Sequence, residues 1–127
     1  MEQTYSLAID GNDNIIVGGG TFGSFPGFTN FGQVDAFIRK YDSSGYELFT
    51  RQFGSSTIAY VYSIAVDSSN SIIVGGTACG AFPGFTNAGS GSSGNCGDAF
   101  IRKYDESGNE LFTRQYMDHL RKMKFTA

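Results

Sequence analysis

Cys79 and Cys96 are the only cysteines in the chain, and both flank a loop rich in Gly and Ser. A disulfide between them would span a step of 17 residues and stabilise the fold by about 3 kcal/mol on loop-entropy grounds. In a reducing compartment the same pair would remain two free thiols. Zinc would need further ligands, and the sole histidine, His119, is distant in the sequence. The pair therefore predicts a disulfide and no metal site.

The hexapeptide Phe-Pro-Gly-Phe-Thr-Asn occurs twice, at 25–30 and 82–87. Aromatic faces stack on sugar rings and Asn or Thr side chains hydrogen-bond to hydroxyl groups, so these loops are candidates for carbohydrate contact. The alternative is that the first Phe of each copy packs against its own sheet. The candidate ligand-binding residues are Phe25, Phe28, Asn30, Phe82, Phe85 and Asn87.

Acidic and basic side chains offer weaker signals. The segment from Asp10 to Asn14 spaces oxygens like a calcium loop, but Ile15 and Thr21 stand where that motif needs Gly and Glu. A turn closed by Asx side chains explains it better. The basic residues of the strands are expected to form solvated cross-strand pairs with nearby acids; they are Arg39, Lys40, Arg51, Arg102, Lys103 and Arg114, facing Asp35, Glu47, Asp98 and Glu110.

Catalytic machinery is not visible in the sequence. There is no Ser/His/Asp order and no phosphate-binding loop, and Gly18-Gly19-Gly20 ends a strand without a following helix. Two carboxylates could meet in a ring channel as in glycosidases, but nothing singles out a pair. We predict a protein that is not an enzyme, with no catalytic residue and no cofactor.

The elements that carry these residues repeat. Tyr5–Asp10, Ile15–Gly19 and Phe25–Asn30 each return 57 residues later, and Asp35–Asp42 returns 63 residues later as Asp98–Asp105. The change of offset places a six-residue insertion within 88–97, a longer surface loop. We assign residues 1–56 to one unit, 57–116 to a second and 117–127 to a divergent basic tail, which we expect to be a poorly ordered end or one helical turn.

Each unit reads as four short strands. Period-two alternation, a β-branched run and Asx-Gly turns predict an antiparallel meander, and four strands repeated every 50–60 residues are typical of propeller blades. The expected strands are 4–10, 15–19, 35–42 and 47–53 in the first unit, then 59–67, 71–77, 98–105 and 110–116 in the second.

The repeated motifs resemble the SBBP repeat, a family named for its presumed seven-bladed β-propellers. The resemblance covers residues 4 to 116 and rests on D-A-F-I-R-K-Y-D-x-S-G-x-E-L-F-T-R-Q, Y-S-I-A-V-D-S-S and I-I-V-G-G-T. It implies an all-β fold of two four-stranded antiparallel blades, in a bacterial or archaeal protein of extracellular or cell-surface location. The family has no assigned activity or catalytic motif, so the resemblance implies a fold and leaves the function open.

Two blades cannot close a ring, because propellers contain about four to eight. Either copies of this chain complete the ring or the chain is a fragment of a longer protein. Copies add blades in pairs, so three copies would give six and four would give eight. We predict a homo-oligomeric interaction scaffold, with a lectin-like module as the alternative.

Composition limits the other partners. Nine basic against twelve acidic residues, with a pI near 4.9, disfavour nucleic acid. No apolar run approaches the roughly 18 residues of a membrane span, and residues 1–5 show no feature of a secretory signal. Besides copies of itself, protein or glycan partners are the ones we expect.

Overall fold

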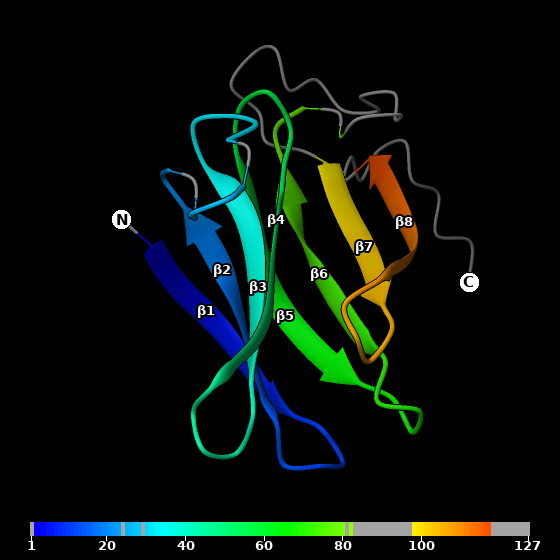
Figure 1. The fold of residues 1–127 in the computed structure, drawn as a ribbon. Helices are drawn as coiled ribbons and strands as arrows, with labels where there is room; N and C mark the ends of the chain where they lie inside the picture. Colours follow the sequence, from blue (N-terminus) through cyan, green and yellow to red (C-terminus); the bar gives the residue numbers. More distant parts are fainter. Residues whose placement is uncertain (1, 24, 29, 81, 83–97, 118–127) are drawn as a thin grey trace, which may run out of the picture.

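The computed structural model describes residues 2–23, 25–28, 30–80, 82 and 98–117 of the 127-residue chain. These residues form eight strands and no helix, in two four-stranded antiparallel sheets that do not close on each other (Figure 1). The first sheet contains β1 (Glu2–Ile9), β2 (Ile15–Thr21), β3 (Asp35–Tyr41) and β4 (Glu47–Phe53), and the second contains β5 (Ala59–Val66), β6 (Ile72–Ala78), β7 (Asp98–Tyr104) and β8 (Glu110–Met117). The all-β prediction is confirmed for this part of the chain.

Strand order follows the sequence in both sheets, β1-β2-β3-β4 and β5-β6-β7-β8. The predicted strands differ from the observed ones only at their ends. β1 begins at Glu2 rather than Thr4, because its first residues pair with the Gly-rich end of β2. β8 continues to Met117, the first residue assigned to the tail.

The outer hairpins are closed by the turn chemistry that the sequence predicts. In the β3–β4 turn, Asp42 Oδ1 accepts hydrogen bonds from the backbone N–H of Ser44 at 2.9 Å and of Tyr46 at 3.0 Å. Gly45 adopts a φ of +92° and Gly108, in the β7–β8 turn, a φ of +90°. Only glycine adopts this conformation without a steric cost.

The hydrophobic core lies between the two sheets. β5 contacts β1, β2 and β3, so the second sheet packs against the first along its initial strand (Figure 1). The fully buried side chains come from both sheets and include Ile16, Ile38, Val61, Val74 and Phe100. Each sheet therefore buries one face against the other and leaves its second face outside this core.

No helix in the described ranges is both long and apolar enough to cross a bilayer.

Candidate functional site: two open sheet faces

The contact between the sheets defines two kinds of face. We call the face of the first sheet that contacts the second sheet the trailing face, and the face of the second sheet that contacts the first the leading face. The trailing face of unit 1 contains Ile16, Gly18, Ala36, Ile38 and Phe53, and the leading face of unit 2 contains Ile64, Val74, Phe82, Phe100, Arg102 and Tyr104. Because the units repeat, each has one face of each kind.

Phe53 lies at the centre of the contact. Its ring centroid is 5.7 Å from that of Phe100 and 5.9 Å from that of Phe82, both in edge-to-face geometry. The guanidinium carbon of Arg102 lies 4.1 Å from the Phe53 centroid. The aromatic side chain of one unit thus enters a cluster of aromatic and cationic groups on the next, an arrangement that adds to simple area burial.

Polar contacts to backbone carbonyl groups hold the outer edge of the interface. Lys40 Nζ donates to the carbonyl oxygen of Glu106 at 2.9 Å, and Arg51 Nε donates to that of Gly108 at 2.7 Å. Lys40 Nζ also lies 3.1 Å from Asp10 Oδ2, with only 3% of the lysine side chain and none of the aspartate side chain exposed. The prediction of a solvated charge was wrong for Lys40, because the β7–β8 turn of the second unit covers it.

Asp10 closes the β1–β2 turn, as the sequence predicts. Its Oδ1 accepts hydrogen bonds from the backbone N–H of Asn12 at 2.8 Å and of Asn14 at 2.9 Å. Burial acts to raise the pKa of Asp10, but the hydrogen bonds from Asn14, Asn12 and Lys40 outweigh it, and the pKa is lowered from 3.8. Among the described residues, no group of three or more His, Cys, Asp or Glu side chains could hold a metal ion.

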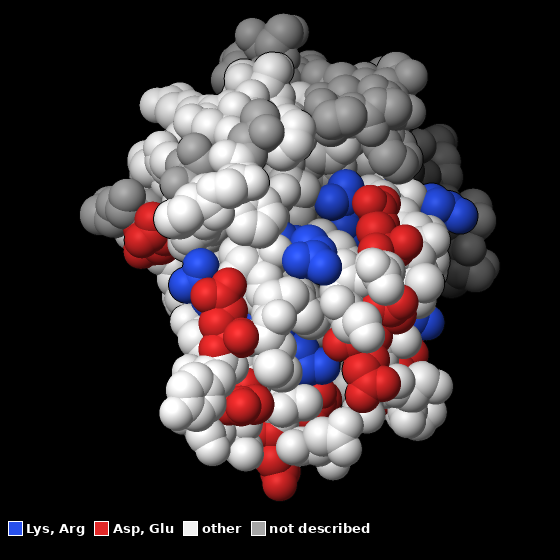
Figure 2. All heavy atoms as spheres, viewed as in Figure 1, with Lys and Arg blue, Asp and Glu red and all other residues white. Residues whose placement is uncertain are grey.

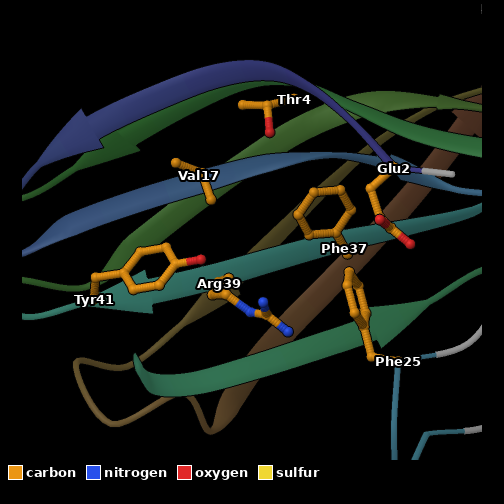
Figure 3. Close-up of a pocket in the computed structure, with 7 residues that line it drawn as sticks. All are labelled: Glu2, Thr4, Val17, Phe25, Phe37, Arg39 and Tyr41. Carbon is orange, nitrogen blue, oxygen red and sulfur yellow. The ribbon is translucent and has the colours of Figure 1, made fainter. Parts of the chain in front are cut away.

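The leading face of unit 1 is open and hollowed. Its hollow has a volume of about 150 Å³ and is lined by Glu2, Thr4, Val17, Phe25, Phe37, Arg39 and Tyr41. Figure 3 shows Phe25, Phe37 and Arg39 turned toward one another. The Arg39 guanidinium carbon lies 4.6 Å from the Phe25 centroid, and the rings of Phe25 and Phe37 are 5.2 Å apart. The hollow therefore presents the same residue types that surround Phe53 in the second unit.

None of the described strands covers the trailing face of unit 2. Ile101 is 36% exposed and Tyr116 40% exposed, whereas their counterparts Ile38 and Phe53 are 0% and 5% exposed. The open faces are thus the leading face of unit 1 and the trailing face of unit 2. The equivalent faces, the leading face of unit 2 and the trailing face of unit 1, are buried against each other.

The structure places the sequence-predicted ligand residues in different settings. Phe82 is buried in the core and Phe25 is half-buried against its own sheet, each with its backbone N–H bonded to a β-strand glutamine, Gln115 and Gln52. Phe28 is half-buried and Asn30 exposed. Phe85 and Asn87 lie outside the described residues. A sugar contact at these loops stays a prediction.

Cys79 is buried and is not a free thiol. Its backbone N–H donates to the carbonyl oxygen of Ile58 at 2.9 Å, which fixes the end of β6 beside the segment that joins the two sheets. Cys96 lies outside the described residues, so the pairing of the two cysteines stays a prediction.

Cross-strand charge pairs form at equivalent positions of both units. Arg39 lies 3.7 Å from Glu47 and Arg102 lies 3.8 Å from Glu110, as the sequence predicts. Asp35 instead accepts hydrogen bonds from backbone N–H groups of the preceding loop and from Gln52. Figure 2 shows acidic and basic side chains interspersed over the viewed face, with no large area of one sign.

Sequence reasoning missed the asymmetry between the two units, because their third strands are identical in sequence. The two repeats indicate that a stack of two units leaves two outer faces uncovered, but the sequence does not indicate which face of each unit meets the other.

Comparison with known proteins gives little further constraint. No family model matches the chain. Regulatory protein FlaEY of Caulobacter vibrioides is 34% identical over 84 residues, which cover 65% of this chain but only 9% of that protein. The similarity is thus to a small part of a much longer polypeptide.

Proposed function

We propose that this chain is a non-enzymatic β-propeller repeat scaffold, an interaction module that completes its array of blades by assembling with copies of itself. The observation that carries the proposal is the sheet-on-sheet contact: a trailing face is covered by a leading face once within the chain, and one face of each kind is left open.

Energetic reasoning supports assembly. Repeat units of this kind bury their apolar faces on neighbours, and about three or more are usually needed for stability. The open faces expose large apolar side chains, including Leu7 at 62%, Ile9 at 53% and Tyr116 at 40%. Apolar patches of this kind on a soluble protein commonly mark interaction sites. The resemblance to the SBBP repeat supports the propeller geometry.

The mass of the full chain in solution tests the proposal. Size-exclusion chromatography with light scattering should give a multiple of 13.7 kDa, and three or four copies would bring the blade number into the range that propellers use. A folded monomer of 13.7 kDa at concentrations near 100 μM would contradict it.

A further inference from the structure

We infer that the trailing face of unit 2 binds the leading face of unit 1 in a second copy of this chain, in the same register as the contact between the two units. This inference rests on the proposed function and specifies it: the contact is heterologous, head to tail, and each copy contributes different residues to it.

The leading face of unit 1 is more exposed than the leading face of unit 2, which supports its role in the proposed contact. Unit 1 exposes 62% of Leu7 and 53% of Ile9, whereas their counterparts Ile64 and Val66 are half-buried against the core. Val17 is half-buried, and its counterpart Val74 is fully buried. Apolar side chains thus stand at these three positions in both units, and they are more exposed in unit 1 than in unit 2.

The hollow on this face matches one particular side chain. Phe53 fills the equivalent position on unit 2, between Phe82, Phe100 and Arg102. Its counterpart on the open trailing face is Tyr116, with a ring of nearly the same size. In a second copy, Tyr116 would enter the hollow lined by Phe25, Phe37 and Arg39. The extra hydroxyl group has Glu2, which lines the same hollow, as a polar neighbour.

The polar anchors of the interface are also duplicated. Lys103 and Arg114 stand in unit 2 where Lys40 and Arg51 stand in unit 1. The groups that Lys40 and Arg51 bind are backbone carbonyl oxygens, of Glu106 and Gly108. The corresponding carbonyl groups of unit 1 belong to Ser43 and Gly45. Because the acceptors are backbone atoms, the change from Glu106 to Ser43 does not remove an anchor.

One position where the units differ shows a compensating pair of changes. A Cβ atom on Gly20 would lie 2.6 Å from the ring of Tyr60, so the intrachain contact needs glycine there. Unit 2 has Thr77 at the position of Gly20, and unit 1 has Gln3 at the position of Tyr60. In the proposed contact Thr77, which is larger than Gly20, would meet Gln3, which is narrower and more flexible than Tyr60. The close approach of the two units therefore stays possible.

Gly75 offers a variant that separates docking from folding. Among the described residues, a Cβ atom on Gly75 would meet only the carbonyl oxygen of Phe100, at the ordinary distance of 3.7 Å. A Cβ on the equivalent Gly18 would lie 3.0 Å from both Ile64 and Val61. In the proposed contact, Leu7 and Thr4 of the second copy take the places of Ile64 and Val61. Gly75→Val should therefore leave the isolated chain folded and block the trailing face.

Two variants and their mixture test the inference. Gly75→Val blocks the trailing face, and Leu7→Glu places a charge on the leading face. Each variant should fold, by circular dichroism and thermal unfolding, and should run at 13.7 kDa where the unaltered chain assembles. Mixed in equal amounts, the two should form a dimer of twice that mass and nothing larger, because each retains the face that the other has lost.

Leu48→Glu is the matched control. Leu48 is 50% exposed and its counterpart Leu111 is 52% exposed, although the two units differ in which face is covered. The position thus lies outside the contact, and the variant should assemble as the unaltered chain does. Assembly of the Gly75→Val or Leu7→Glu variant to full size would overturn the head-to-tail register but leave the proposed scaffold intact, as would a mixture that stays monomeric. A monomeric unaltered chain would overturn both.

Discussion

The strands β3 and β7 have the same sequence, Asp-Ala-Phe-Ile-Arg-Lys-Tyr, yet their side chains have different surroundings. Ile38 is fully buried while Ile101 is 36% exposed, and Tyr104 is 2% exposed while Tyr41 is half-buried. At these two positions the trailing face is buried in unit 1 and the leading face is buried in unit 2. The burial of Ile38 and Tyr104 therefore depends on the unit that covers their face, whereas Phe37, which packs against Phe25, is buried although its face is open.

This contrast allows equivalent substitutions in the two units to be compared. The same chemical change should cost stability where the face is covered and little where it is open. The unfolding free energies should be measured in dilute protein, in which only the contact between the two units of one chain is present.

Phe53→Ala and Tyr116→Ala should show the largest difference. Phe53 is 5% exposed and packs on two aromatic rings and Arg102, so its removal should lower the free energy of unfolding by about 3–5 kcal/mol. Tyr116 is 40% exposed, and its removal should cost about 1 kcal/mol or less. Urea unfolding followed by circular dichroism measures both. Equal losses would mean that the covered trailing face of unit 1 and the open trailing face of unit 2 differ less than the structure shows.

The lysine pair should come next. Lys40→Met leaves the buried Asp10 carboxylate without its cation and the Glu106 carbonyl group without its donor, which should cost about 3 kcal/mol. Lys103 lies 3.3 Å from Asp67, with side chains 28% and 31% exposed, so Lys103→Met should cost about 0.5 kcal/mol. The same unfolding assay applies, and a Lys103→Met loss as large as that of Lys40→Met would contradict the comparison.

The sequence predicted the strands well because their signals are local. β-branched runs, period-two alternation and Asx-Gly turns depend on residues close in the chain, and six of the eight strands begin where expected. The burial of Lys40 could not be predicted in this way. It depends on a turn 66 residues away, whose Glu106 carbonyl oxygen accepts a hydrogen bond from Lys40, and the identical Lys103 shows that the local sequence does not indicate this burial.

The difference between the two Phe-Pro-Gly-Phe-Thr-Asn loops could not be predicted for a related reason. Phe25 and Phe82 lie in identical hexapeptides, so local chemistry suggested that both loops do the same work. The structure buries Phe82 beneath Phe53 and leaves Phe25 at the rim of an open hollow. The identical hexapeptides thus differ in their long-range neighbours, because Phe53 packs on Phe82 and no described residue takes the equivalent place against Phe25.

The turn glycines offer a smaller contrast. Gly45 and Gly108 both have φ near +90°, so alanine at either position is strained by about 1 kcal/mol. A Cβ on Gly108 would also lie 2.9 Å from both Arg51 Nη2 and the Phe49 ring, whereas a Cβ on Gly45 meets nothing within 4 Å. Gly108→Ala should therefore be less stable than Gly45→Ala by a further ~1 kcal/mol. Equal thermal midpoints for the two variants would contradict this.

Acid sensitivity should show the smallest effect. Hydrogen bonds from the backbone N–H groups of Ser71 and Ser69 and the charge of Lys103 lower the pKa of Asp67 below 3.8 despite an opposing effect of burial. A lowered pKa in the folded state means that the unfolded chain takes up the proton first, so the contribution of Asp67 is complete above its unfolded pKa and is lost as pH falls through the folded one. Asp67→Asn should therefore unfold less steeply with acid between about pH 5 and pH 3 than the unaltered chain. Unfolding free energies measured at several pH values test this, with Asp13→Asn as the control because Asp13 is exposed on the equivalent turn of unit 1. An unchanged slope for Asp67→Asn would show that the turn hydrogen bonds persist when the carboxyl group is protonated.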